Sequence, residues 1–154
     1  MEEVGNLSLS KGGHLQLRSA RSLTLRYTIP VHKTAKFWEA LREGKIVTTR
    51  CKRCGRIYFP PTADCTRCMG DEMDWIELSG EAELEAFTEI HIKPASFRNY
   101  PNYICAVGKL KEGPRALAWL VGVERGDIKV GMKLHLRPKV AEDDGGLTYE
   151  YTPG

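Results

Sequence analysis

Four cysteines constrain the fold of this chain more than any other feature of its sequence. They stand in two Cys-x-x-Cys pairs with ten residues between the pairs, at Cys51, Cys54, Cys65 and Cys68. Each pair can clamp one edge of a tetrahedron while the intervening segment folds back as a hairpin, which is the arrangement of a structural zinc ribbon. Gly55 and Gly70 follow the pairs closely and suit the tight turns that bring backbone amides toward the sulfurs.

The ligand set also limits what the metal can do. Four thiolates leave no open coordination position, so the sequence predicts a structural Zn²⁺ ion and no metal catalysis. A redox dithiol is the alternative interpretation of a Cys-x-x-Cys motif, but it needs one pair in a thioredoxin-like setting, and this chain has two pairs in series. The fifth cysteine, Cys105, lies in an apolar stretch, and we expect it to be a small buried side chain rather than a reactive thiol.

The cysteine count bears on the compartment as well. Five is an odd number, and the first residues, MEEVGNLSLS, are acidic and lack the apolar core of a signal peptide. No apolar run approaches the roughly 20 residues that a membrane-spanning helix needs. We therefore expect a cytoplasmic protein with reduced or metal-bound thiols and no membrane partner.

The formal net charge of +3 overstates the attraction to a polyanion, because it counts the cysteines as neutral thiols. Four thiolates and one Zn²⁺ together contribute two negative charges, which lowers the total to about +1. Six basic residues lie between Lys45 and Arg67. Two interpretations stay open for the four beside the knuckles, Lys52, Arg53, Arg56 and Arg67: they offset the charge of the zinc centre, or they form a phosphate site for a nucleotide-like ligand. Eight acids and no Lys or Arg follow between Asp71 and Glu89.

Residues 33–44 have the pattern of a short helix. Thr34 can cap its start, Gly44 suits the position after its end, and three apolar side chains fall on one face, namely Phe37, Trp38 and Leu41. Core packing is one interpretation of this face. Docking on another protein is the other, and it makes Phe37 and Trp38 candidate partner-binding residues.

The chain beyond Trp75 has the pattern of five short strands. Residues 81–87 alternate, which predicts their glutamates outside and Ala82, Leu84 and Ala86 inside. Further strands are predicted at residues 103–110, 116–123, 133–140 and 147–151. With a long loop after the first strand, this pattern predicts a small five-stranded barrel of the OB type, in a chain that is mainly β with a short N-terminal helix.

The strand at residues 116–123 is nearly continuous in apolar side chains, which predicts that both of its faces are covered. Either the N-terminal helix or another protein could supply that cover. The second option makes Trp119 a candidate partner-binding residue.

Several segments resemble the zinc-ribbon OB-fold proteins of the DUF35 family, over about residues 27–154. The matching segments are FWEALREGKIVTTRCKRCGRIYFPP, CTRC, WIELSGEAELEAFTEI, YICAVGKLKEGPRALAWLVGV, DIKVGMKLHL and YEYTPG. The resemblance implies a rubredoxin-like zinc ribbon followed by an OB-fold barrel. The expected domains are an N-terminal arm that exceeds the family pattern, a helical segment, the zinc ribbon and the OB-fold domain, at residues 1–26, 27–46, 47–76 and 77–154.

The resemblance further implies a non-catalytic subunit. Members of the family lie beside thiolases, hydroxymethylglutaryl-CoA (HMG-CoA) synthases or related aldolases, where they hold the assembly together and help to bind or channel acyl-CoA. We therefore expect a scaffold for acetoacetyl-CoA thiolase and/or HMG-CoA synthase of the mevalonate pathway, without independent activity. The four histidines are dispersed and none stands in a catalytic motif, which agrees with that expectation.

The loop at residues 93–102 is the candidate contact with CoA or acyl-CoA. It carries Lys93 and Arg98, which could face phosphates, and Phe97 and Tyr100, which could pack on the adenine ring. A proline-stiffened connection without a ligand is the alternative interpretation.

Two functions from other classes are weighed against the scaffold. An OB barrel with a zinc ribbon also binds single-stranded nucleic acid, but the outward glutamates of residues 81–85 would repel phosphates, so we do not expect a nucleic-acid partner. An acyl-CoA hydrolase or lyase would need a nucleophile and base that the sequence does not offer.

Overall fold

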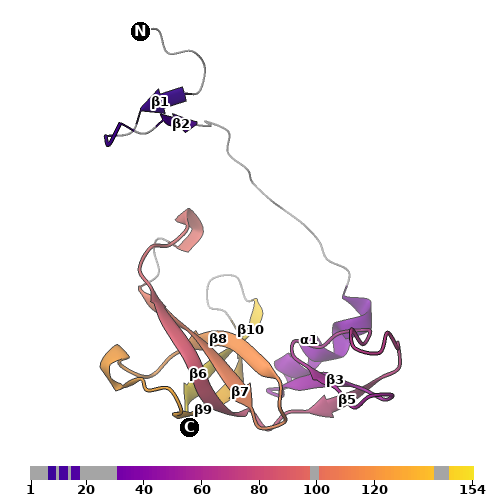
Figure 1. The fold of residues 1–154 in the computed structure, drawn as a ribbon. Coiled ribbons are helices and arrows are strands. Elements are labelled where there is room, and N and C mark those ends of the chain that lie inside the picture. The colour runs from indigo at the N-terminus through magenta and orange to yellow at the C-terminus, as the bar shows by residue number, and fades with distance from the viewer. Residues whose placement is uncertain (1–6, 10, 14, 18–30, 98–100, 141–145) are drawn as a thin grey trace. The chain divides into compact units, whose positions relative to one another are not determined.

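The computed structural model describes residues 7–9, 11–13, 15–17, 31–97, 101–140 and 146–154. The chain divides into two compact units, residues 1–30 and 31–154. In the first unit, β1 (Leu7–Leu9) and β2 (Leu15–Leu17) pair antiparallel, with a turn described at residues 11–13, and the remaining residues of the expected arm lie outside the described ones. The second unit contains the cysteine pairs and all later strands (Figure 1).

The second unit begins with a helix and a three-stranded sheet. η1 (His32–Thr34) leads into α1 (Ala35–Arg42), and β3 (Val47–Cys51) lies between β4 (Ile57–Tyr58) and β5 (Met73–Glu77), antiparallel to both. The helix ends before Gly44, whose φ of +77° is a conformation that glycine adopts without steric cost. The predicted side-chain cap is wrong, because Thr34 Oγ1 donates to the Val31 carbonyl oxygen at 3.3 Å and caps no helix amide.

A closed five-stranded barrel follows the ribbon. Its strands are β6 (Glu81–Ile90), β7 (Tyr103–Leu110), β8 (Arg115–Leu120), β9 (Lys133–Val140) and β10 (Leu147–Pro153). The order around the barrel is β10-β8-β7-β6-β9, and every neighbouring pair is antiparallel except β8 with β10. Short 3-10 turns, η2 (Ala95–Phe97) and η3 (Arg125–Asp127), lie in the connections. The predicted fold class is confirmed: one short α-helix among the described residues, mostly strands, and a barrel after a four-cysteine ribbon.

Tyr151 occupies the centre of the barrel and is fully buried. Its hydroxyl lies 3.3 Å from the Gly108 carbonyl oxygen and 3.2 Å from that of Ala116, so β10 is tied to β7 and β8 from inside. A Cβ atom at Gly108 would come within 2.6 Å of the Tyr151 hydroxyl oxygen, which explains why this strand position is a glycine.

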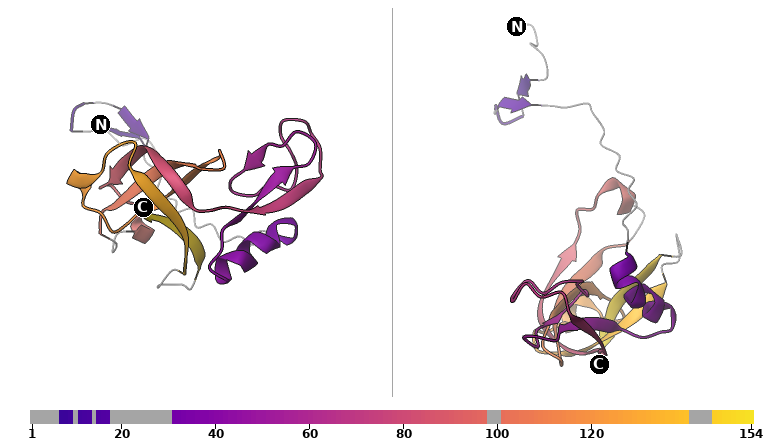
Figure 2. Two further views of the ribbon diagram at one scale, coloured as in Figure 1. Left: turned by 90° about the horizontal axis from the view of Figure 1, so that it is seen from below. Right: turned by 90° about the vertical axis from the view of Figure 1, so that its right-hand side faces the viewer.

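An aromatic contact joins helix, ribbon and barrel into one core. Phe37 of α1 is 3% exposed and packs edge-to-face against Phe59 of the ribbon and Tyr149 of β10, with ring centroids 6.1 and 6.2 Å apart. Phe59 and Tyr149 also meet each other, at 5.1 Å. Figure 2 shows α1 beside both the ribbon and the barrel, and α1 packs against β3, β9 and β10.

The inward and outward pattern of β6 differs from the prediction. A register shift between Leu84 and Ala86 inserts one extra residue into β6, and a β-bulge of this kind reverses the alternation that follows it. Ala86, predicted inside, is therefore exposed, and Phe87 packs against the core instead. Cover of both faces of β8 from within the chain, by the helix, is also wrong, because the burial of β8 alternates and Leu117 is 63% exposed.

Glu150 of β10 is a carboxylate in an almost fully buried position, with 3% of the residue exposed. Arg137 Nη2 lies 2.7 Å from its Oε1, and Lys139 Nζ lies 3.0 Å from Oε2, an oxygen without a well-aligned hydrogen bond. Burial alone would raise the pKa of Glu150, but the interactions with Arg137 and Lys139 outweigh it and lower the pKa below its usual value. The ionised form is thus the one that the fold stabilises.

We expect Glu150→Gln to lower the free energy of unfolding at pH 7 by about 1–3 kcal/mol, because it removes charge-assisted hydrogen bonds from a buried site. Since the folded-state pKa is lowered, the contribution is complete above the ordinary glutamate pKa and disappears as the pH falls through the folded value. The difference between wild type and variant should therefore shrink in acid. Urea titrations at several pH values measure it, and Glu39→Gln, at an exposed position of α1, is the control. A difference that grows in acid would contradict the assignment.

Candidate metal centre and interaction surfaces

The four predicted zinc ligands converge at one end of the ribbon sheet. Their sulfurs all lie within 4.8 Å of one another, and the Cys51–Cys68 and Cys54–Cys65 Sγ pairs are each 3.5 Å apart. A tetrahedral Zn²⁺ with bonds of about 2.3 Å places its sulfurs about 3.8 Å apart, whereas a disulfide needs about 2.05 Å. The thiolate donor set and its spacing therefore fit a zinc ion, which would clamp the two knuckles together.

The two knuckles have matching backbone geometry. Gly55 N donates to the Cys51 carbonyl oxygen and Met69 N donates to that of Cys65, both at 2.9 Å. Each of these donors follows its first cysteine by four positions and has a positive φ, +72° for Gly55 and +57° for Met69. The backbone of Gly70 does hydrogen-bond Cys68, as expected, but the positive φ of the second knuckle falls one residue earlier, on Met69, which is 85% exposed.

Tyr58 supports the centre, and no local sequence pattern pointed to it. Its hydroxyl lies 3.1 Å from Cys65 Sγ. This hydrogen bond contributes most, and together with backbone hydrogen bonds from Cys68 and Arg67 it lowers the pKa of the Cys65 thiol to about 5, although burial opposes the change. The hydrogen bond favours the thiolate, which is the form that binds metal.

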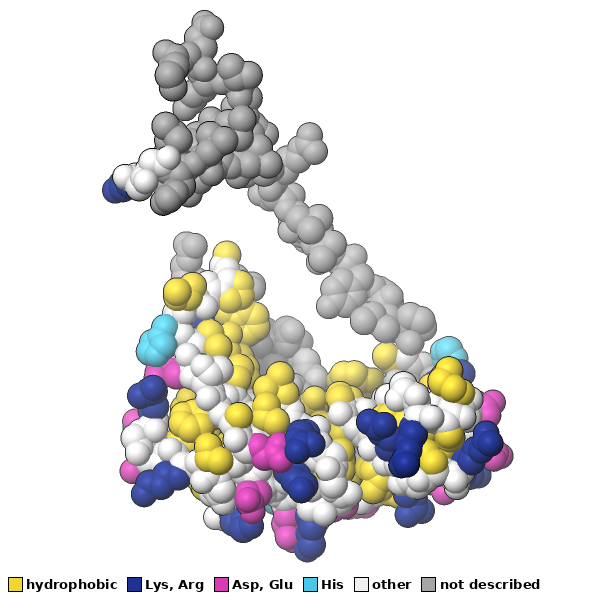
Figure 3. Space-filling model, in the orientation of Figure 1, with side chains coloured by type: hydrophobic (Ala, Val, Ile, Leu, Met, Phe, Trp, Pro, Cys, Tyr) yellow, Lys and Arg dark blue, Asp and Glu magenta, His cyan; other side chains and the backbone are white. Residues whose placement is uncertain are grey.

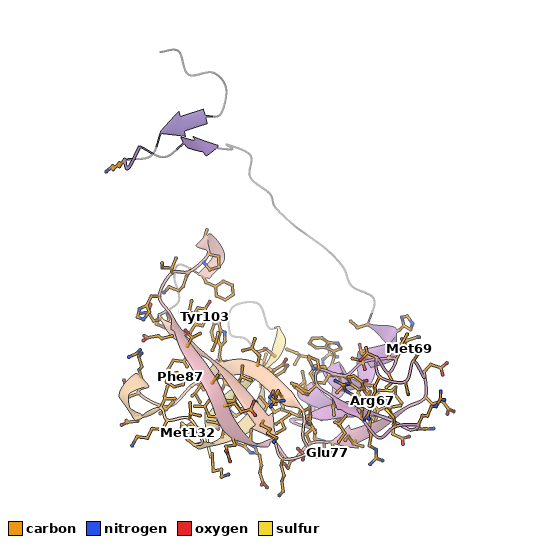
Figure 4. All side chains as sticks on the ribbon, viewed as in Figure 1. Arg67, Met69, Glu77, Phe87, Tyr103 and Met132 are labelled. Carbon is orange, nitrogen blue, oxygen red and sulfur yellow. The ribbon has the colours of Figure 1, made fainter. Side chains whose placement is uncertain are left out.

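The basic residues of the ribbon do not focus on one point. Arg50 and Lys52 lie 3.9 and 3.8 Å from Asp74 carboxylate oxygens, and the Arg56 guanidinium lies over the Tyr58 ring, 5.4 Å from its centroid. Arg67 lies beside Met69 on the ribbon (Figure 4). Neither interpretation of these cations is decided, and the contacts of Arg50, Lys52 and Arg56 do not gather the three around one point.

The candidate ligand and partner residues on the barrel fall together at the upper end of β7 and β8. Tyr103 stacks on Trp119, with ring centroids 4.3 Å apart at an interplanar angle of 20°. Phe97 of η2 lies 6.0 Å from Tyr103 and 6.1 Å from Trp119. Tyr103 was not predicted as a site residue, and the alternation of its strand offered no signal for this contact.

The other candidates lie elsewhere or outside the described residues. Lys93 is half-buried, and Arg98 and Tyr100 are not among the described residues. The burial of Phe37 places its ring in the core, so Trp38, at 37% exposed, is the member of the pair that a partner could reach.

No part of this geometry forms a recognisable catalytic centre among the described residues. The ring nitrogens of His91 lie 3.1 Å from the Glu89 carboxylate and 2.7 Å from the Asn102 amide nitrogen. Neither partner is a nucleophile that the imidazole could activate. Cys105 is half-buried, and burial raises the pKa of its thiol, which makes it a poor nucleophile. In the same described ranges, no helix has the length and apolarity to span a bilayer.

Comparison with known proteins agrees with this architecture. The rubredoxin-like zinc ribbon domain of ChsH2 matches residues 38–74, and the C-terminal OB-fold domain of ChsH2 matches residues 75–138. A DUF35 domain-containing scaffold protein from Methanocaldococcus jannaschii is 30% identical over 132 residues, which cover 82% of this chain and 94% of that protein. The chain belongs to the DUF35 family.

Two further similarities link this DUF35 protein to enzyme subunits. The benzoylsuccinyl-CoA thiolase subunit BbsA from Thauera aromatica is 33% identical over 73 residues, which cover 47% of this chain and 49% of BbsA. Among solved structures, the Ltp2-ChsH2(DUF35) aldolase matches with a TM-score of 0.69 and 26% identity, covering 83% of this chain and 98% of that one. The predicted family is thus confirmed, and the relatives include scaffold proteins and subunits of enzymes.

We expect the wild-type protein and Cys105→Ser to bind one zinc ion per chain, and Cys51→Ser to lose tight zinc binding. The reason is that Cys51 supplies one of the four converging sulfurs, while Cys105 lies in β7. Metal analysis of the purified proteins measures the stoichiometry, and Co²⁺ substitution reports tetrahedral sulfur coordination by its absorption. Full stoichiometry in Cys51→Ser would contradict the assignment.

We expect Met69→Gly to raise the free energy of unfolding by about 0.5–1 kcal/mol. A left-handed conformation costs a non-glycine residue about 1–2 kcal/mol, and the greater freedom of glycine in the unfolded chain returns part of the gain. Met69→Ala removes the same side chain but keeps the strained conformation, so it should give no gain. Thermal or urea unfolding of the zinc-loaded proteins compares the two, and a glycine variant no more stable than the alanine variant would contradict the strain.

Proposed function

We propose that this DUF35 protein is a non-catalytic partner subunit of a thiolase-superfamily acyl-CoA enzyme complex, which holds enzyme subunits together and helps to bind or channel acyl-CoA. The names of the relatives support the general form of this proposal, since they describe scaffold proteins, a thiolase subunit and an aldolase assembly. The finer form names acetoacetyl-CoA thiolase and/or HMG-CoA synthase of the mevalonate pathway, and it rests on the family resemblance alone.

The closed four-sulfur site is the observation that carries the non-catalytic part of the proposal. A metal with four thiolate ligands has no position for water or substrate, so the ion can hold the ribbon but cannot act as a Lewis acid toward a ligand. Both ring nitrogens of His91 have partners, Glu89 at Nε2 and Asn102 at Nδ1. Catalysis is therefore assigned to the partner.

The acyl-CoA contact remains a proposal with two candidate places. The first is the loop predicted from sequence, with Lys93, Phe97, Arg98 and Tyr100, although Phe97 already packs near Trp119. The second is a cavity of about 480 Å³ between ribbon residues 55–59 and the β7–β8 turn, which Arg56 and Arg115 line. Its volume lies within the range usual for ligand sites, and the Arg56 guanidinium suits a phosphate, whereas Arg115 is already paired with Glu85 and Glu112 adds a carboxylate to the lining.

Single-stranded nucleic-acid binding is the second candidate function, because one argument against it no longer holds. The outward glutamates of β6 are each paired with a cation: Glu81 with Lys111 at 3.0 Å, and Glu83 with Lys133 at 2.9 Å. Glu85 likewise holds Arg115, whose Nη2 lies 3.0 Å from Oε1. Paired carboxylates repel phosphates less than free ones. The names of the relatives still favour the enzyme partner.

Affinity purification of the tagged, zinc-loaded chain from its native source tests the proposal. We expect a thiolase-superfamily enzyme in stoichiometric amounts, and no turnover of acyl-CoA by the purified chain alone. Recovery of nucleic-acid machinery, with salt-dependent binding of single-stranded DNA or RNA, would favour the second candidate. Acyl-CoA turnover without a partner would contradict the non-catalytic assignment.

A further inference from the structure

The outer surface of the barrel over β6, β7 and β8 divides into a charged part and an apolar part. The charged part holds the ion pairs of Glu83 and Glu85 with Lys133 and Arg115. Above it, cross-strand neighbours form two rows, Ala86 with Val107 and Leu117, and Thr88 with Cys105 and Trp119. Figure 3 shows hydrophobic side chains over the upper part of this region and charged side chains below. We call the two rows, with Tyr103 above them, the outer apolar face.

The side chains of this face point away from the barrel core. Their strand neighbours Ala106, Ala118 and Leu120 are buried, and successive side chains of a strand alternate between faces. Leu117, at the β8 end of the lower row, is 63% exposed. Within the described residues, the helix does not cover it, since α1 packs against β3, β9 and β10.

The bulge in β6 creates the apolar character of the face. Without the extra residue, the outward positions after Glu83 would be taken by Glu85, Phe87 and Glu89. With it, Phe87 packs inward and Glu89 is held by Arg125, whose Nε lies 2.9 Å from Oε2. The bulge in β6 thus keeps Glu89 off the outer apolar face.

Most charges that border the face are already paired within the chain, and Lys109 lies opposite Glu83, whose pKa its charge helps to lower. Glu150 lies opposite Trp119 in the β8–β10 pair and holds Arg137 and Lys139 on the side toward β9. The ion pairs of Glu83 and Glu85 close the lower edge. A complementary surface therefore needs no charge of its own, and an uncharged apolar one fits best.

The size of the face indicates the kind of partner. The two rows contribute six side chains and Tyr103 a seventh, whereas each side of a stable interface contributes roughly 20–30 residues. Two copies of this chain joined only through this face would bury too little surface for a stable dimer. Tyr, Trp and Leu with a polar border instead match the central part of a larger interface.

We propose that the outer apolar face binds the enzyme subunit of the acyl-CoA complex, with Leu117 and Trp119 entering an uncharged apolar part of that subunit. The partner comes from the proposed function, on which this inference rests. The new content is the place of contact on this chain and the apolar chemistry of the surface that it meets.

Two lysine substitutions test the place of contact. Leu117→Lys puts a charge on the β8 side of the face, and Val130→Lys puts the same charge outside the face, at a position that is 66% exposed against 63% for Leu117. The probe is the thiolase-superfamily subunit of the source organism, produced separately and titrated with each full-length, zinc-loaded chain. We expect Leu117→Lys to weaken the affinity at least about tenfold and Val130→Lys to change it less than about twofold, because charges are costly in the centre of an interface.

Each other outcome would overturn the inference in a distinguishable way. Equal affinity of both variants would place the contact elsewhere and leave the proposed function intact, whereas no binding by the wild type would count against the proposed function itself. A wild-type chain that is a dimer by light scattering, and a Leu117→Lys chain that is a monomer, would make a second copy the occupant. A large fall in the unfolding midpoint of isolated Leu117→Lys, without one in Val130→Lys, would mean that the chain covers this face itself.

Discussion

The contact of Phe37, Phe59 and Tyr149 is the interaction on which the rest of the second unit depends. It joins the helix, the ribbon and the barrel, three elements that local sequence patterns would allow to fold separately. Phe59 can reach this contact because the hairpin between the two cysteine pairs is fixed at its base by the converging sulfurs. Thr49 adds a second fixing point, since its Oγ1 lies 2.9 Å from Thr62 N on the return path. The metal centre therefore acts as a structural clip whose effect reaches the barrel.

Charge in this protein is used locally and is largely neutralised where it stands. Arg50 and Lys52 near the knuckles pair with Asp74, the acids of β6 have partners on neighbouring strands, and Glu150 holds two cations in a buried site. These paired charges contribute little to steering a polyanion. The outer apolar face of the barrel suits a lasting contact with another protein better than a transient contact with phosphates.

Much of the fold could be predicted because its signals are local. Each of these signals lies within a few residues of the structure that it predicts. The paired cysteines predicted the ribbon, the glycine after the helix predicted the helix end, and the alternating strands predicted the barrel. The failures concern geometry that only the assembled structure defines. The bulge that turns Ala86 outward depends on how β6 pairs with β7, and the left-handed turn falls on Met69 although a glycine stands next to it. Tyr58 and Tyr103 act through partners 7 and 16 residues away, which no local pattern reveals.

The ribbon and the barrel share one core, and we propose that the outer β7–β8 surface binds an enzyme. Hydrogen–deuterium exchange of the zinc-loaded chain, alone and in the reconstituted complex, measures both features. We expect slow exchange of β3 and the barrel strands in both states, with new protection on complex formation centred on residues 103–120. Exchange of the ribbon that is fast and independent of the barrel, or protection that avoids residues 103–120, would contradict this arrangement.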